Sequence, residues 1–166
     1  MANIYCYPSQ SLTMANTRGI FSKILVAIDG SEASMDAANY AVEMARKDNA
    51  NLIVIHVVTS EMGYADISGE ISSSSIREIS DMVKQEAQRW FDKIKLKTDQ
   101  LKIDLKTDVV VSKTNATHTI VDYADSEKVD LIVMGTRGKS GFKKLLVGST
   151  ASGVVTYASC PVMVVK

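Results

Sequence analysis

The amino-acid sequence predicts an α/β fold: a single three-layer domain in which a five-stranded open parallel sheet carries helices on both faces. Two observations support this class. Five short apolar runs alternate along the chain with four segments of helical periodicity, which is typical of strand–helix–strand units with right-handed crossovers. The chain has 166 residues, the length of about one domain, since domains usually have roughly 100–200 residues.

The predicted strands are continuous apolar runs rich in branched residues. Continuous hydrophobicity indicates strands that are buried on both faces, as in parallel sheets. The third run alternates partly, and we therefore expect it nearer the edge of the sheet. The predicted strands span Lys23–Ile28, Asn51–Val58, Asp104–Val111, Asp130–Met134 and Pro161–Val165.

The predicted helices lie between these runs. Ser31 is a suitable N-cap for the first helix, whose small residues Ala37, Ala41 and Ala45 would let it pack closely against a sheet. The second carries apolar residues at spacings of three or four, which indicates a stripe that faces a core. The first helix is expected over 31–47, the third over 117–128, and the fourth from near Ser149. The apolar stripe of the long second helix consists of Ile76, Ile79, Val83, Ala87, Trp90 and Ile94.

The domain is expected to span residues 22–166. Residues 1–21 have polar and turn-prone residues without a sustained period, and we interpret them as a flexible N-terminal extension. No run approaches the ~20 apolar residues that cross a bilayer, and the N-terminus lacks the features of a secretory signal. We therefore expect a cytoplasmic protein without a membrane partner.

The composition argues against nucleic-acid binding. Nineteen Lys and Arg balance nineteen Asp and Glu, so the formal net charge is zero, whereas phosphate contacts along a nucleic acid require an excess of cations. Cys6 and Cys160 lie far apart and form no metal-site spacing; Cys160 is expected to be a small buried hydrophobe. Among the histidines, we expect His56 in the core with its polar atoms satisfied and His118 on the surface.

The segment that follows the fourth strand carries the clearest functional signal. Residues 135–150 read GTRGKSGFKKLLVGST, with glycines directly after the strand and again at the start of the last helix. Glycine lets backbone approach a ligand closely, and a helix N-terminus offers unpaired N–H groups with partial positive charge. The cations Arg137, Lys139, Lys143 and Lys144 add to this charge. The segment predicts an anion site, and the phosphates of a nucleotide are the expected ligand.

Other phosphate and nucleophile motifs do not fit. Gly138-Lys139-Ser140 is similar to the end of a P-loop, but the first glycine of that motif would fall at Val133. The sequence has no G-x-G-x-x-G after a strand, so a dinucleotide fold is unsupported. A G-x-S-x-G nucleophile elbow is also absent.

The spacing of the glycines resembles a known family. Gly135, two residues, Gly138, nine residues and Gly148-Ser149 are similar to the nucleotide-binding signature of the ATP-binding branch of the universal stress proteins. The resemblance covers Lys23–Lys166 and includes KILVAIDGS at the first strand, IHVV at the second, DLIVMG at the fourth and CPVMVV at the last. Four separate blocks therefore match in order.

This resemblance implies a sheet of order 3-2-1-4-5, ATP in the cleft above the first and fourth strands, and a homodimer through strand 161–165. Carried over residue by residue, the resemblance implies that Asp29 would face the adenosine half, with Ala27 and Ile28 beside it. The Val57 backbone would meet the adenine edge, and Met134 and Gly135 would line the ribose and α-phosphate. The residues that would hold phosphates are Arg137, Gly138, Gly148, Ser149 and Thr150. The family often has Pro or Val at the position of Ala27, and its glycine after the third strand is replaced here by Ser112–Asn115.

Two classes of function remain open. The first is an ATP-binding regulator in stress adaptation, with Mg²⁺ held mainly by phosphate oxygens and water, not by a protein metal site. The loop offers no dedicated general base, so fast hydrolysis is not expected. The second is a slow ATPase or a nucleotidyl-transfer enzyme. An adenylating enzyme should have a Ser-Gly-Gly-rich loop after its first strand, where this chain has Asp29-Gly30-Ser31-Glu32. A scaffold without nucleotide would leave the glycine pattern unexplained.

Overall fold

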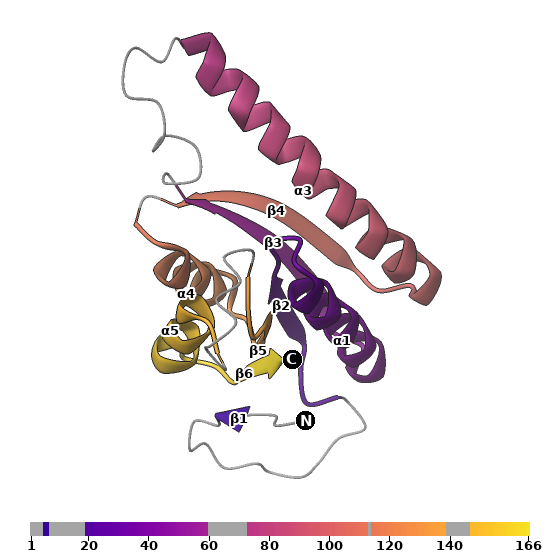
Figure 1. Ribbon diagram of the computed structural model, residues 1–166. Coiled ribbons are helices and arrows are strands. Elements are labelled where there is room, and N and C mark those ends of the chain that lie inside the picture. The colour runs from indigo at the N-terminus through magenta and orange to yellow at the C-terminus, as the bar shows by residue number, and fades with distance from the viewer. Residues whose placement is uncertain (1–4, 7–18, 60–72, 113, 139–146) are drawn as a thin grey trace.

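The computed structural model describes residues 5–6, 19–59, 73–112, 114–138 and 147–166, and it is an α/β domain built around one sheet (Figure 1). The five long strands are parallel, as predicted, and their boundaries agree with the predicted ones to within about one residue. The elements are β1 (Tyr5–Cys6), β2 (Lys23–Ala27), α1 (Glu32–Asp48), β3 (Asn51–Thr59), α3 (Ser73–Leu101), β4 (Leu105–Ser112), α4 (Ala116–Glu127), β5 (Leu131–Gly135), α5 (Ser149–Tyr157) and β6 (Val162–Val165).

The strand order is β1-β6-β5-β2-β3-β4, which confirms the predicted order 3-2-1-4-5 for the five parallel strands. The chain runs from β2 outward through β3 to β4, and then crosses to β5 on the other side of β2. In register, Ala27 at the end of β2 lies opposite Ile55 on one side and Met134 on the other. The order of the strands therefore reverses at β2, and ligands of open α/β sheets bind at the carboxyl edge of such a reversal.

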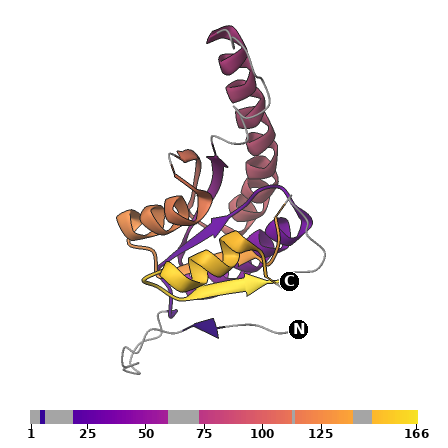
Figure 2. The same ribbon diagram turned by 60° about the vertical axis from the view of Figure 1, so that its left-hand side comes forward.

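Helices cover both faces of the sheet, with α1 and α3 on one face and α4 and α5 on the other (Figures 1 and 2). Successive β2 side chains supply two separate cores, because side chains alternate between the faces of a strand. Ile24 and Val26 pack with α1 and α3, and Leu25 packs with α4 and α5; all three are fully buried. The alanines of α1 are buried against the sheet, as expected from their small size.

A sixth strand, which the sequence did not predict, lies at one edge of the sheet. β1 pairs with β6 in antiparallel direction, with Tyr5 opposite Met163 and Cys6 opposite Val162. A strand of two residues leaves no hydrophobic period in the sequence. At the other end of the predicted extension, the Phe21 N–H donates to the Asp48 carboxylate (2.9 Å). Residues 1–4 and 7–18 lie outside the described part of the chain.

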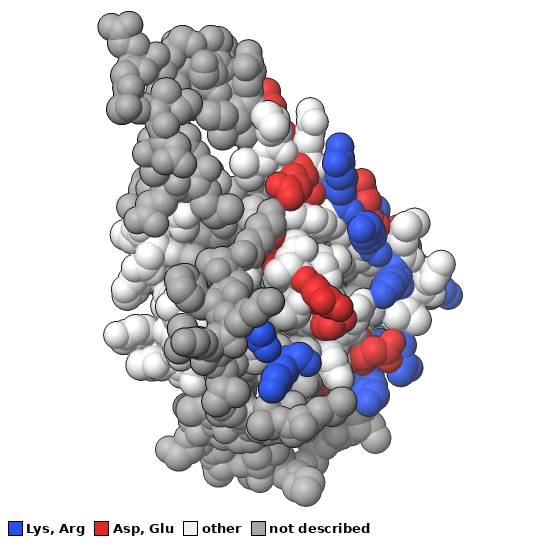
Figure 3. All heavy atoms as spheres, in the orientation of Figure 1, with Lys and Arg blue, Asp and Glu red and all other residues white. Residues whose placement is uncertain are grey.

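The charged surface is mixed in sign. Over the part of the view that α1 and α3 occupy, basic and acidic side chains stand next to one another (Figure 3). Some of these side chains form ion pairs: on α3, the Lys95 Nζ lies 3.0 Å from the Asp99 carboxylate, one helical turn further along. In the described segments, no helix combines the length and the apolar character that a membrane span requires.

Helices α1 and α4 end in residues with left-handed backbone. Asn49 caps α1 at φ 54°, and Lys128 caps α4 at φ 55°. The Lys128 N–H donates back to the carbonyls of Ala124 and Asp125, which stops the helix. Asparagine tolerates this conformation well, whereas the Cβ of lysine is strained in it.

We predict that Lys128→Gly raises the free energy of unfolding by about 0.5–1 kcal/mol, because glycine adopts positive φ without a Cβ clash. The control is Lys128→Ala, which removes the same exposed side chain but keeps the Cβ. Urea denaturation of the three proteins measures the effect. An equal gain for alanine and glycine would show that the lysine charge, and not the backbone conformation, limits stability.

Candidate functional site

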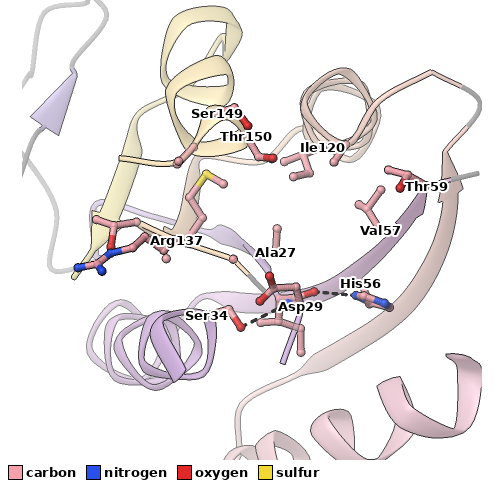
Figure 4. A pocket seen from close by; sticks show the side chains of 18 residues that line it. Ala27, Asp29, Ser34, His56, Val57, Thr59, Ile120, Arg137, Ser149 and Thr150 are labelled. Carbon is pink, nitrogen blue, oxygen red and sulfur yellow. Dashed lines mark hydrogen bonds between the residues drawn. The ribbon is translucent and has the colours of Figure 1, made fainter. Parts of the chain in front are cut away.

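A single pocket collects all the residues that the resemblance assigned to a nucleotide. It has a volume of about 480 Å³ and lies at the carboxyl edge of β2 and β5 (Figure 4), which is the position expected for a reversal of strand order. Small-molecule sites usually have volumes of about 300–1,000 Å³. The predicted residues that line it are Ala27, Ile28, Asp29, Val57, Met134, Gly135, Arg137, Gly138, Gly148, Ser149 and Thr150.

Seven further residues, which were not predicted from the sequence, line the pocket: Ser34, His56, Thr59, Ala116, Ile120, Thr136 and Ala151. Ile120 belongs to the core cluster under α4, so the wall of the pocket continues the core. Thr59 ends β3, two residues after Val57. The contribution of α4 could not be read from the sequence, because only the folded topology brings it to the pocket.

Three helices begin at this pocket, and they differ in how their first N–H groups are satisfied. At α1, the Ser31 hydroxyl accepts from the Ser34 N–H (3.3 Å). At α4, the Asn115 side chain accepts from the His118 N–H (3.0 Å). The N-cap of α5 is Gly148, and no side chain among the described residues caps this helix. The first N–H groups of α5 are therefore the ones that can serve an anion in the pocket.

The N–H of Gly148 itself is already used within the protein. It donates to the carbonyl of Thr136 (2.7 Å), and this bond joins the two ends of the segment between β5 and α5. The Thr136 N–H in turn donates to the Val165 carbonyl on β6 (2.7 Å). A phosphate at this end of the pocket would consequently meet the N–H groups of Ser149, Thr150 and Ala151.

Asp29 is held at the mouth of α1. One carboxylate oxygen accepts from both the Ser31 N–H (3.0 Å) and the Ser31 hydroxyl (2.6 Å), as in an Asx turn. The other oxygen faces Gly138, where an added Cβ would collide with it. The start of the glycine segment is thus packed directly on the Asp29 carboxylate, and Gly138 is needed for that close approach.

Gly135 has a different constraint. A Cβ at this position would lie 2.7 Å from the Ala33 carbonyl carbon and 2.9 Å from the Ser34 nitrogen. These are backbone atoms of α1 and its first turn, which cannot move aside as a side chain can. Gly135 therefore lets β5 pass close to the start of α1, in addition to lining the pocket.

Arg137 is exposed, and its side chain points outward, on the opposite side of the pocket from Val57 and Thr59 (Figure 4). A phosphate contact by this guanidinium would require the side chain to turn inward. The other cations of the predicted site, Lys139, Lys143 and Lys144, lie outside the described residues.

His56 has the environment that the sequence predicted, whereas Cys160 is less buried than predicted. His56 is 3% exposed, and its Nδ1 lies 2.8 Å from the Ile28 carbonyl. Cys160 is half-buried against the α4–α5 core, and burial, with the nearby charge of Asp125, raises the pKa of its thiol to about 11. The thiol is therefore protonated at neutral pH and is a poor nucleophile. His118 is exposed on α4.

No cluster of three or more His, Cys, Asp or Glu side chains able to bind a metal occurs in the described segments. The features that converge on the pocket are therefore an uncapped helix start, a carboxylate, and apolar walls formed by residues such as Val57, Ile120 and Met134. This combination suits a ligand with one anionic end and one flat apolar end.

Comparison with known proteins identifies the family. The model of the universal stress protein family matches residues 21–166. The chain belongs to the universal stress protein family. This confirms the resemblance that the glycine spacing indicated.

Similar proteins cover nearly the same length. The universal stress protein MJ0531 of Methanocaldococcus jannaschii is 34% identical over 154 residues, with 91% of this chain and 85% of the relative covered. Among solved structures, UspA of Lactobacillus plantarum has a TM-score of 0.70 and 31% identity, covering 91% of this chain and 100% of its own. MJ0577 of M. jannaschii has a TM-score of 0.76 and 26% identity, covering 89% and 96%.

The two glycines after β5 should respond differently to an added methyl group. We predict that Gly135→Ala lowers the free energy of unfolding by about 1–3 kcal/mol, since the Cβ meets backbone and the core must be displaced. Gly138→Ala meets only the Asp29 carboxylate, which can rotate, and should cost less than about 1 kcal/mol. Urea denaturation measures both, and equal losses would contradict this difference in packing.

Proposed function

We propose that this universal stress protein binds ATP or a related adenine nucleotide in the pocket, and that nucleotide occupancy acts as a regulatory switch in stress adaptation. The observation that carries the proposal is the start of α5, which is left without a side-chain cap while the other two helices at the pocket are capped within the chain. Among the three helices that begin at the pocket, α5 is thus the one whose first N–H groups remain for an anion.

The base would lie at the opposite end of the pocket. Val57 and Ile120 offer apolar surface from β3 and α4, and flat bases bind well between such walls. The backbone of Val57 has the orientation to read the edge of a base. Ile55 directs its carbonyl toward β2, where it accepts from the Ile28 N–H (2.9 Å), and alternate residues of a strand direct their polar groups to the same side. Val57 therefore directs its backbone N–H and carbonyl toward the space beyond the end of β2.

The phosphates would lie at the start of α5, with Gly138 against Asp29 on the other side. A carboxylate so close to a triphosphate is repulsive unless a cation or a sugar hydroxyl intervenes. We infer that Asp29 binds ribose hydroxyls or approaches Mg²⁺, and that Mg²⁺ comes with ATP, ligated mainly by phosphate oxygens and water. The exposed Arg137 can turn toward the phosphates.

Relatives of the same fold support an adenine nucleotide. A universal stress protein in complex with cAMP has a TM-score of 0.64 and 22% identity. One from Archaeoglobus fulgidus in complex with dAMP has 0.61 and 24%, and one from Arabidopsis thaliana with AMP bound has 0.58 and 16%. At these identities the likeness is one of fold, and the choice of ATP for this chain rests on its own pocket and glycine spacing.

A route for the switch runs through Thr136. The two backbone hydrogen bonds of Thr136 join the pocket to β6. The Thr136 carbonyl accepts from the Gly148 N–H at the start of α5, and the Thr136 N–H donates to the Val165 carbonyl on β6. Phosphates that reposition the segment between β5 and α5 would thus act on β6. We propose that the predicted strand 161–165, which contains β6, forms the homodimer interface that responds to the nucleotide.

We predict that Ser149→Pro weakens ATP binding by about tenfold or more, because it removes one N–H that would donate to a charged phosphate. Proline suits the first position of a helix, and Gly148 before it is extended (φ −69°, ψ 160°), as a residue before proline should be. Isothermal titration calorimetry with ATP, AMP and adenosine measures the effect, and the affinity for adenosine should stay within about twofold.

Ser149→Ala is the matched control, since it removes the hydroxyl but keeps the N–H. If Ser149→Pro binds ATP as tightly as the unaltered protein, α5 does not hold the phosphates and the proposal for this end of the pocket is wrong. Phosphate release measured on the same samples separates a binding protein from an ATPase.

The homodimer has a competitor within the chain. β1 pairs with β6 at Val162 and Met163, so a second copy that pairs with this edge must displace β1 or extend beyond it. We predict that replacing Tyr5 and Cys6 by proline, which removes their N–H donors, increases the dimer fraction. Sedimentation velocity at micromolar concentration measures it. If both the unaltered protein and the proline variant sediment as monomers, the proposed homodimer is wrong.

A further inference from the structure

A buried histidine, His56, lies behind the turn that carries Asp29 into the pocket, and the role that we assign to it rests on the proposed function. After β2 ends at Ala27, the chain turns through Ile28, Asp29 and Gly30 before α1 begins. Gly30 has a φ of 80°, a left-handed conformation that favours glycine. The turn is thus specified by backbone geometry, and its surroundings decide where the Asp29 carboxylate points.

The hydrogen bonds of Ile28 depart from a regular parallel ladder. Its N–H donates to the Ile55 carbonyl (2.9 Å), and the next bond of a parallel ladder would join the Ile28 carbonyl to the N–H of Val57. The described structure lacks that bond. The His56 ring takes its place, with Nδ1 2.8 Å from the Ile28 carbonyl. Because a carbonyl oxygen can only accept, Nδ1 carries the hydrogen and donates it.

This substitution has two consequences for the pocket. The Ile28 carbonyl accepts from the His56 ring and not from β3 backbone, and this bond helps to hold the peptide between Ile28 and Asp29 in one orientation. The N–H of Val57, which a continued ladder would have used, remains directed at the pocket that Val57 lines. His56 therefore acts on both sides of the pocket: it shares the placement of Asp29 with Ser34, whose hydroxyl accepts from the Asp29 N–H (3.3 Å), and with Ser31, which binds the carboxylate. It also leaves free the backbone N–H that would read a base.

His56 is itself held by Trp90 of α3. The two rings meet edge to face, with centroids 5.1 Å apart and planes at 85°, a favourable aromatic geometry. The same indole covers Gly30 so closely that an added Cβ there would overlap the ring. Trp90 thus packs on the histidine and on the turn at once, and it fixes the position of each relative to the other.

We infer that His56 is a positioning residue for the nucleotide site: its Nδ1–H holds the Ile28–Gly30 turn and keeps the Val57 N–H available for the ligand, with Trp90 as its support. The buried ring has no contact with solvent that would explain it otherwise, since it is 3% exposed. Its polar role in the pocket is carried out through Ile28 and not by contact with the phosphates.

Two substitutions separate the donor from the ring. His56→Asn keeps an N–H donor at the position of Nδ1 but removes the ring, whereas His56→Phe keeps a ring but has no donor. In calorimetric titrations with AMP and ATP, we expect His56→Phe to bind about tenfold more weakly, because the Ile28 carbonyl loses its buried partner. His56→Asn should remain within about threefold of the unaltered protein.

His118→Asn is the control for the loss of a histidine, because His118 is exposed on α4 and does not line the pocket; its affinity should not change. Far-UV circular dichroism shows whether each variant is folded. Binding by His56→Phe that equals the unaltered protein would overturn the inference. Binding by His56→Asn that is as weak as that of His56→Phe would also overturn it, since the ring and not the donated hydrogen would then be what matters.

Hydrogen exchange without nucleotide distinguishes this inference from the proposed function. We expect faster exchange of the amides of residues 28–31 in His56→Phe, by about tenfold, and little change in His56→Asn. Unchanged exchange in His56→Phe would overturn the inference whether or not nucleotide binds. If the unaltered protein binds no adenine nucleotide, the proposed function is wrong, and the exchange rates still decide the role of His56.

Discussion

The structure depends on the early end of one central strand. β2 pairs with β3 on one side and β5 on the other, but it stops at Ala27, while β3 continues to Thr59. The shortened strand leaves a notch in the sheet edge, and the chain must turn away from it to begin α1. The pocket is that notch, closed from the sides by α4 and α5. Because the core fixes the strand order, it also fixes the position of the notch.

Among the described residues, the chain itself satisfies several of the polar groups around the notch. Ser31 and Asn115 cap two helices, Ser31 also holds Asp29, and His56 holds the Ile28 carbonyl. At α5 the cap is a glycine without a side chain. A site that is rigid and satisfied except where a ligand binds loses little entropy on binding. The hydrogen bonds of Thr136 extend this frame from the pocket to β6.

The sequence predicted the fold because its strongest signal, the continuous apolar strand, reports burial on both faces. Strand boundaries followed from the same signal, whereas β1, with two residues and no period, left none. The pocket residues came from glycine spacing and the family resemblance, and all of them line one cavity. The contribution of α4 was missed because it depends on long-range topology. The Gly148 N–H donates to the Thr136 carbonyl, and neither composition nor glycine spacing could predict that bond.

Helix α3 has a mechanical property that follows from its length. Its amino-terminal part projects beyond the sheet (Figure 1), and at a rise of 1.5 Å per residue Ser73 lies about 26 Å along the helix axis from Trp90. Trp90 is where the helix touches the turn below Asp29. Pivoting there acts as a lever: a tilt of only about 5° would carry the far end of this 29-residue rod through roughly 2 Å.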